Sequence, residues 1–306
     1  MGVDAREPVM HELIDADAPL ERLVGGFGFI EGPLWLPDGH LLFTDIPGNA
    51  IIRWSEADGS HVWRQPSGHA NGLGLTAGGD VVACEHDRSV IVRLDAAGGG
   101  EVLASHFGSK ELNSPNDLAV AADGSILFTD PHPAGRTADW GVERPQELDF
   151  NGAFRLEPHG GAVALIAGDF AFPNGLCLSP DESILYVNDT LRVHIREFRL
   201  SSGWAVESDR VLITMGPEAR MDGALIVPSD PTMDGLPDGM KCDAWGNVWC
   251  SGPGGIWVVS PAGEHLGTVE VPEFAANLAW GGLDRSDLFV TASTTLYRIR
   301  TRVPGA

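Results

Sequence analysis

Residues 31–45 carry the sequence EGPLWLPDGHLLFTD, in which a polar opening precedes an apolar segment, a turn, and a second apolar segment ending in Thr44-Asp45. This order of features occurs six times along the chain. The openings are Glu31-Gly32-Pro33, Asn71-Gly72-Leu73, Asn116-Asp117-Leu118, Asn174-Gly175-Leu176, Asp238-Gly239-Met240 and Asn277-Leu278-Ala279. The endings follow about fourteen residues later, at Asp45, Glu85, Asp130, Asp189, Gly252 and Ala292. A repeat of this kind sets the architecture before any single residue is considered.

Each unit contains short apolar segments separated by turn signals. In the first unit these segments are 32–36, 41–44, 51–54 and 61–64. Short strands at this spacing, with Gly and Asp turns between them, indicate an all-β sandwich, barrel or propeller. The last unit stops after its third strand at 295–299, and its missing fourth strand is available at 20–24. Closing a ring in this way removes the free sheet edges, so the sequence predicts a six-bladed β-propeller closed by an N-terminal strand.

We therefore expect a single propeller domain over 1–306, with an N-terminal extension at 1–18. Two units are longer than the others because they carry insertions, Pro131 to Asp149 and roughly Pro217 to Leu236. Both insertions contain polar, Gly and Pro residues and are predicted to be loops.

The composition suits a large core and argues against some partners. The 306 residues and 43% hydrophobic content are normal for one closed all-β fold. The formal net charge of −23 repels phosphate backbones, which argues against nucleic-acid binding. The four cysteines form no CxxC pair and lie in apolar runs, so we expect buried thiols instead of disulfides or zinc ligands. They are Cys84, Cys177, Cys242 and Cys250.

No segment indicates secretion or a membrane. The stretch from Met1 to Ala18 is polar and charged and lacks the apolar region of a signal peptide. No run approaches the roughly 18–20 apolar residues that span a bilayer. We expect a cytoplasmic protein that acts on a small molecule and has no membrane partner, and the sequence leaves its oligomeric state undetermined.

The six openings are expected to ring one mouth of the central channel. The first strand of each propeller blade lines the channel, and the antiparallel second strand ends beside the start of the first. Glu31 and Asp238 would supply charge there, while Asn116 and Asn174 would supply amide oxygens. Oxygen donors of this kind suit Ca²⁺ or Mg²⁺, and less so Mn²⁺ or Fe²⁺. Carboxylates crowded at a narrow pore raise one another's pKa values unless a cation is present.

A structural interpretation stays open for single members of this ring. Asn-Gly and Asp-Gly are the commonest turn dipeptides, and Asp38-Gly39 is a plain turn of that kind. The shared register of the openings favours a functional role for the ring as a whole. Asn71 and Asn277 fit a structural role equally well.

Four motifs then point to a family. They are Glu31-Gly32-Pro33-x-Trp35, Ser114-Pro115-Asn116-Asp117, Phe172-Pro173-Asn174-Gly175-Leu176 with Ser179-Pro180-Asp181, and Pro237-Asp238-Gly239-Met240. Together they resemble the gluconolactonase / senescence-marker-protein-30 family. The closing segment, Ala276-Asn277-Leu278-Ala279 with Thr291-Ala292-Ser293, resembles its bacterial gluconolactonase branch.

The resemblance implies hydrolysis of a sugar lactone, such as glucono-1,5-lactone to gluconate, by a six-bladed propeller with one divalent cation in its channel. Ca²⁺ is the first choice, with Mg²⁺, Mn²⁺, Zn²⁺ and Fe²⁺ as alternatives. The implied ligands are Glu31, Asn116, Asn174 and Asp238. The animal branch has a sugar-contacting Arg two residues before the second-motif Asn. Here that position is Ser114, so the substrate contacts of that branch do not carry over.

In such a reaction a cation polarises the lactone carbonyl while a deprotonated water attacks it. By resemblance, Asp238 is the first candidate for the base, and Asp130, Asp189 and His86 are alternatives at the same mouth. Asp130 and Asp189 are equally suited to capping strand ends, and His86 to a loop hydrogen bond. The candidates for substrate binding are Asn71, Asn113, His86 and Asp130.

Other functions remain open at this point. The chain has no Gly-x-Ser-x-Gly elbow and no His-Glu-x-x-His pair, which argues against a serine nucleophile or a zinc protease site. A related metal-dependent esterase or phosphotriesterase would share the cation but not the pocket. A non-enzymatic propeller scaffold is the third alternative, although a scaffold has no use for this set of oxygen donors.

Overall fold

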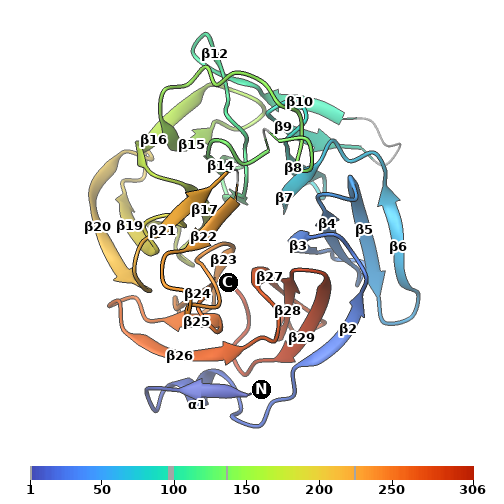
Figure 1. Cartoon of the computed structure of the whole chain (residues 1–306), viewed down its shortest axis with the longest axis vertical. Helices are drawn as coiled ribbons and strands as arrows, with labels where there is room; N and C mark the ends of the chain where they lie inside the picture. The colour runs from blue at the N-terminus through green and yellow to red at the C-terminus, as the bar shows by residue number, and fades with distance from the viewer. Residues whose placement is uncertain (1, 96–99, 136, 224) are drawn as a thin grey trace.

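The computed structural model describes residues 2–95, 100–135, 137–223 and 225–306. Within these residues six sheets stand as blades around a central channel, and the chain passes through them in order (Figure 1). The first strand of each blade is the innermost, and the fourth is the outermost except in blade five, where a fifth strand lies outside it. The prediction of a six-bladed β-propeller is confirmed.

The first three blades have four strands each, and their strands follow one another in sequence. Blade one contains β3 (Ile30–Trp35), β4 (Leu41–Asp45), β5 (Ala50–Ser55) and β6 (Gly59–Arg64). Blade two contains β7 (Ala70–Leu75), β8 (Val81–Glu85), β9 (Val90–Leu94) and β10 (Gly100–Ala104). Blade three contains β13 (Leu118–Val120), β14 (Ile126–Asp130), β15 (Asn151–Leu156) and β16 (Val163–Phe170). A short hairpin, β11 (His106–Phe107) and β12 (Lys110–Glu111), connects blades two and three.

The last three blades follow the same plan, with two additions from the N-terminus. Blade four contains β17 (Pro173–Leu178), β18 (Ile184–Asp189), β19 (His194–Leu200) and β20 (Val206–Thr214). Blade five contains β23 (Met240–Cys242), β24 (Val248–Gly252), β25 (Gly255–Val259) and β26 (His265–Glu270), with β1 (Val3–Ala5) as a fifth strand. Blade six contains β27 (Ala275–Gly281), β28 (Asp287–Ala292) and β29 (Thr295–Arg300), with β2 (Glu21–Gly25) as its outer strand.

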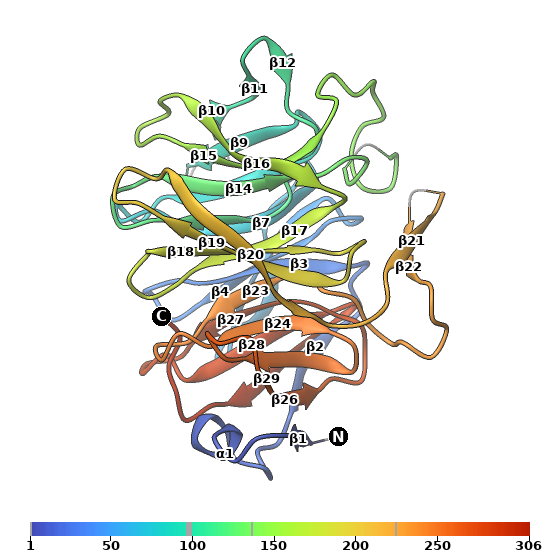
Figure 2. The same cartoon turned by 90° about the vertical axis from the view of Figure 1, so that its left-hand side faces the viewer.

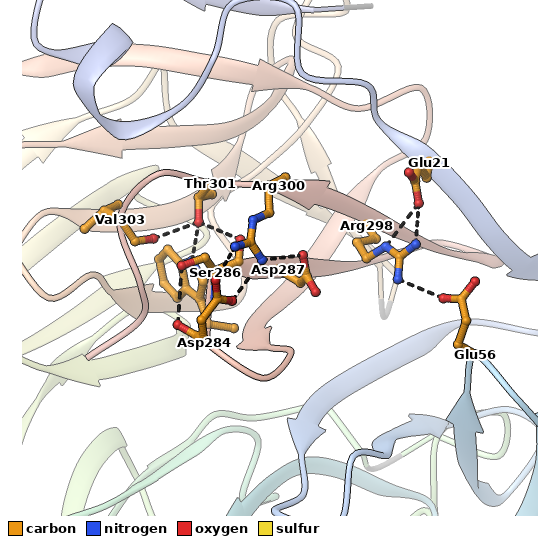
Figure 3. A network of polar contacts seen from close by, with 10 residues as sticks. Glu21, Glu56, Asp284, Ser286, Asp287, Arg298, Arg300, Thr301 and Val303 are labelled. Carbon is orange, nitrogen blue, oxygen red and sulfur yellow. Dashed lines mark hydrogen bonds and ion pairs between the residues drawn. The ribbon is translucent and has the colours of Figure 1, made fainter.

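The ring is closed by β2, as the sequence predicts. This strand pairs antiparallel with β29, and Glu21 lies opposite Arg298. The Arg298 guanidinium donates to Glu21 at 2.6 Å and to Glu56 of blade one at 2.8 Å, so one side chain of β29 contacts both the closing strand and blade one (Figure 3). The pairing with β2 satisfies the strand edge of β29 that would otherwise be free.

The N-terminal extension is more ordered than the sequence indicates. β1 pairs with β26, and the single-turn helix α1 (Met10–Leu13) follows it. Met10, Leu13 and Ile14 are fully buried in the apolar cluster that contains Trp249. A three-residue strand and a four-residue helix are too short to leave a periodic pattern in the sequence.

The two insertions differ from each other. The described residues of 131–149 contain no strand or helix, as expected for a loop. The second insertion, predicted to be a loop, instead contains a β-hairpin of β21 (Ala219–Asp222) and β22 (Leu225–Pro228) that extends away from the blades (Figure 2). The segment carries Asp222-Gly223, the same dipeptide that occurs at Asp38-Gly39, so the sequence held a hairpin signal that the loop prediction did not use.

The apolar core lies between neighbouring blades. Trp35 of blade one stacks on Phe289 of blade six at 5.3 Å, and Trp249 of blade five contacts Trp280 of blade six at 5.3 Å. All four cysteines are buried and free, which confirms the expectation of unpaired thiols. In the described part of the chain, no helix has the length and apolar character to span a membrane.

Glycines after the openings allow the blades to approach closely around the channel. The Gly72 N–H donates to the Asn116 carbonyl at 2.8 Å, and the Gly175 N–H donates to the Asp238 carbonyl at 3.1 Å. A Cβ atom on Gly175 would collide with that same Asp238 oxygen. Gly32 has a φ of +50°, and a Cβ on it would collide with the Asn71 carbonyl. These contacts align the openings of successive blades at one level of the channel.

Replacement of Gly32 tests the importance of this close approach. Gly32→Ala combines left-handed backbone strain with a collision, so we expect a loss of about 3 kcal/mol or more in the free energy of unfolding. Gly39 is the matched control because its φ is +85° and nothing lies within 4 Å of an added Cβ. Gly39→Ala should cost only about 1–2 kcal/mol. Urea denaturation in chelator measures both, and equal losses would contradict the close-approach argument.

Candidate active site

The openings of five blades meet in one cavity of about 280 Å³ at a mouth of the channel. They contribute Glu31, Asn71, Asn116, Asn174 and Asp238 to its lining. The sixth opening residue, Asn277, is buried and donates its amide N–H to Glu31 Oε2 at 2.8 Å. The structure therefore brings together all four predicted metal ligands, and Asn277 supports one of them.

Two carboxyl groups in the cavity are destabilised in their charged form. Burial, reinforced by the nearby Asp117 carboxylate, raises the pKa of Glu31 to about 7. Burial also raises the pKa of Asp238 well above its usual range, with repulsion from Glu31 and Asp117 adding to the effect. Hydrogen bonds only partly offset the rise in the pKa of Glu31, whose Oε2 accepts the Gly32 N–H at 2.7 Å. A bound cation would relieve the repulsion among these groups.

Asp117 and Lys241 form the next layer below the cavity, and sequence reasoning did not select them. Asp117 Oδ2 lies 3.4 Å from the Asn277 amide nitrogen and 3.7 Å from Lys241 Nζ. Asp117 Oδ1 accepts the Leu118 N–H at 2.9 Å. The sequence did contain a signal for Asp117, because this residue occupies the position that is Gly in four of the other openings.

The donor set fits a hard divalent cation. Two carboxylates and two amide side chains converge, and all four can offer oxygen atoms. The side-chain amide nitrogen of Asn174 donates to Thr190 Oγ1 at 3.1 Å, which leaves the side-chain oxygen of Asn174 for a ligand. Among the described residues no three His, Cys, Asp or Glu side chains form a metal-binding group, so the site depends on Asn116 and Asn174 as well.

The blade endings serve mainly to hold the backbone. Asp130 accepts the backbone N–H groups of Asn113 at 2.8 Å and Ser114 at 2.7 Å. Asp189 accepts those of Ala171 at 2.7 Å and Phe172 at 3.1 Å. Each aspartate thus caps the segment that enters the first strand of its own blade.

Of the four residues proposed to bind substrate, Asn71 and His86 line the cavity. Asn113 and Asp130 are fully buried and are not part of the lining. The Asn113 amide group donates to the carbonyls of Asp130 at 3.1 Å and Phe150 at 2.9 Å. These bonds direct the Asn113 side chain into the third blade.

Both insertions contribute walls that sequence reasoning did not assign. Ala134 and Trp140 come from the first insertion, and Leu225 and Ile226 come from β22. Trp140 packs edge-to-face on Phe29 with ring centroids 5.1 Å apart. The insertions lie outside the repeat, so the repeat register gave no indication of where their side chains point.

Residues 29–294 match the family model described as the SMP-30/Gluconolactonase/LRE-like region. The chain belongs to this family. It is 32% identical to a gluconolactonase of Zymomonas mobilis, over 97% of this chain and 85% of that protein. It is 26% identical to a pentonolactonase of Haloferax volcanii, over 86% of this chain and 81% of that protein. A solved structure of a gluconolactonase from Xanthomonas campestris superposes with a TM-score of 0.87 at 31% identity, covering 98% of this chain and 95% of that one.

The raised pKa of Glu31 predicts a specific pH dependence in metal-free protein. Below pH 4.5 the carboxyl is protonated in both folded and unfolded states, and as the pH rises to about 7 the folded state alone retains the proton. Wild-type stability should therefore fall across this window relative to Glu31→Gln, by up to about 3 kcal/mol. Unfolding free energies in chelator at pH 4.5–8 measure the difference.

This comparison removes the opposing effect of buried histidines. Burial lowers the pKa of His86 to about 4, so its contribution to stability is lost as the pH falls from 6.5 toward 4. Both proteins carry that contribution, and it cancels in their difference. Glu207→Gln, at an exposed position, is the control and should show no pH-dependent gap. A wild-type to Glu31→Gln difference that stays constant with pH would contradict the prediction.

Proposed function

We propose that the protein is a hydrolase of carboxylic esters that opens a sugar lactone, with glucono-1,5-lactone as the first candidate. The observation that carries this proposal is the convergence of Glu31, Asn116, Asn174 and Asp238 on one cavity. Family membership and the lactonase names of two relatives support the substrate class.

A divalent cation would be held by these four side chains, and Ca²⁺ suits their oxygen atoms best. The local charge also favours a divalent ion. Glu31, Asp117 and Asp238 contribute three negative charges when ionised, and Lys241 contributes one positive charge, which leaves an excess that a 2+ ion neutralises. When bound, the cation would supply Lewis-acid stabilisation of the charge that develops on the carbonyl oxygen.

Asp238 is the proposed general base. Its backbone is fixed from two sides, because its N–H donates to Ser251 Oγ at 2.9 Å and its carbonyl accepts the Gly175 N–H at 3.1 Å. A water molecule would give a proton to Asp238 as it attacks the lactone carbonyl carbon. Asp238 would then return that proton to the ring oxygen as the bond between this oxygen and the carbonyl carbon breaks, which restores the base and yields the hydroxy acid.

The first test is hydrolysis of glucono-1,5-lactone, followed by proton release with the uncatalysed rate subtracted. We expect activity that disappears in EDTA and returns with Ca²⁺. Asp238→Asn keeps a donor oxygen but removes the base, so kcat should fall by about 10²–10⁴. Asp234→Asn, at an exposed position four residues earlier, is the matched control and should retain activity. Activity that persists in chelator, or none with any divalent ion, would overturn the proposal.

Calcium binding can be tested separately from catalysis. At a Ca²⁺ concentration 100 times its Kd, wild-type protein should gain about 2.7 kcal/mol in the free energy of unfolding. Glu31→Gln removes one charged donor and should lose most of that gain, whereas Glu207→Gln should keep it. Calorimetric titration and thermal melting measure both quantities. Equal calcium stabilisation of all three proteins would place the ion elsewhere.

An ester or phosphotriester with an apolar group is a second candidate substrate. The walls of the cavity above the donor set are largely apolar and include Phe29, Trp140, Phe172, Leu225 and Phe274. Such walls bury hydrocarbon more readily than sugar hydroxyl groups. A panel of pentonolactones, aryl esters and phosphotriesters, assayed with the same protein, ranks these classes by kcat/KM.

A further inference from the structure

His86 is held in the cavity wall by the first insertion. It directly follows the ending of blade two, and its side chain is almost fully buried. Its Nδ1 lies 2.9 Å from the Trp140 carbonyl oxygen, and its own carbonyl accepts the Arg144 guanidinium at 2.8 Å. Gly135 and Gly141 pack against the side chain so closely that an added Cβ on Gly135 would collide with the imidazole ring.

These contacts determine which ring nitrogen carries the proton. A carbonyl oxygen only accepts hydrogen bonds, so Nδ1 must be the donor to Trp140, and in the neutral ring Nε2 then presents a lone pair. Burial lowers the pKa of His86 to about 4, which keeps the ring neutral near pH 7. A nitrogen with so low a pKa is a poor base at that pH, but it remains a good hydrogen-bond acceptor.

The lone pair on Nε2 is buried and has no hydrogen-bond partner within the described residues. A buried acceptor left in this state costs about 1–3 kcal/mol. His86 and Trp140 both line the cavity. Because His86 lines the cavity, a ligand that enters it with an O–H group would supply the donor that Nε2 lacks.

We propose that His86 Nε2 accepts a hydrogen bond from a ring hydroxyl group of the lactone and thereby selects hydroxylated lactones over unsubstituted ones. This inference rests on the proposed lactonase function and specifies its substrate class. It also assigns a purpose to the first insertion, which supplies the carbonyl that fixes the tautomer and the glycines that fix the ring. Ser114 Oγ accepts the Gly135 N–H at 2.8 Å and so anchors that insertion to the third blade.

The main experiment compares two substrates across three proteins. Wild type, His86→Ala and His86→Gln are assayed on glucono-1,5-lactone and on δ-valerolactone, which has the same ring without hydroxyl groups. We expect His86→Ala to lower kcat/KM about 10- to 100-fold on the hydroxylated lactone and less than threefold on δ-valerolactone. His86→Gln offers an amide oxygen as acceptor and should recover part of the selectivity.

Other outcomes separate the alternative roles of His86. An equal loss on both substrates with unchanged melting temperature would make His86 a general base and overturn the inference. An equal loss with a lowered melting temperature would make it a structural residue, which also overturns it. Unchanged kcat/KM on glucono-1,5-lactone in His86→Ala would show that no hydroxyl group binds there.

If wild type hydrolyses neither lactone, the proposed function is rejected but the proposed hydrogen bond to His86 is not. A binding measurement then tests that hydrogen bond by itself. The ligands are 1,5-anhydroglucitol, which carries the ring hydroxyl groups without a lactone carbonyl, and tetrahydropyran, which carries none. Titration by NMR should show that wild type prefers the polyol and that His86→Ala loses this preference. An equal preference in both proteins would overturn the inference independently of any hydrolysis.

Discussion

The site depends on the backbone contact between neighbouring blades at the mouth of the channel. At three seams the glycine N–H of one opening donates to a carbonyl at the start of the next blade. These bonds run from Gly72 to Asn116, from Gly175 to Asp238, and from Gly239 to Ala276, which directly precedes the sixth opening. Such bonds form only where the chain carries no side chain between the two backbones, and an added Cβ on Gly72 would lie 2.7 Å from Asp117 Cα. The repeated glycine is therefore a packing requirement, and the side chains of the openings meet because their backbones are joined.

Threonine side chains on the second strands join two further seams, one between blades one and two and the other between blades three and four. The Thr44 hydroxyl donates to the Asn71 carbonyl at 3.1 Å, and the Thr129 hydroxyl donates to the Asn174 carbonyl at 2.6 Å. Each bond runs from the ending of one blade to the opening of the next. The Thr-Asp ending thus has two tasks, since Thr129 joins the blades while Asp130 caps its own blade. This division explains why carboxylates such as Asp130 stand at the mouth of the channel without lining the cavity.

The parts of the structure that follow from the repeat could be predicted from sequence. Alternation along strands and antiparallel pairing placed Glu31 and Asp238 at one mouth, although they are far apart in the chain. The parts outside the repeat could not be predicted, because irregular segments have no periodicity to indicate their direction. The position of Trp140 belongs to this group, whereas the hairpin of β21 and β22 has a turn signal at Asp222-Gly223 that the loop prediction did not use. Asn113 was predicted to bind substrate, whereas its amide group donates to the carbonyls of Asp130 and Phe150 within the third blade.

The charged residues of the channel and the residues that form the cavity walls come from different parts of the fold. Glu31, Asp117 and Asp238 are costly to bury as charges, and Lys241 offsets only part of that cost. The seams fix the backbones of these residues in spite of the repulsion, and the proposed divalent cation would relieve it. Selectivity among organic ligands requires side chains whose positions can change without breaking the seams. The first insertion provides such positions. Gly135 donates its N–H to Ser114 Oγ and packs on His86, and neither contact is one of the seam bonds. We infer that the ring of openings fixes the chemistry and that the insertions set which substrate reaches it.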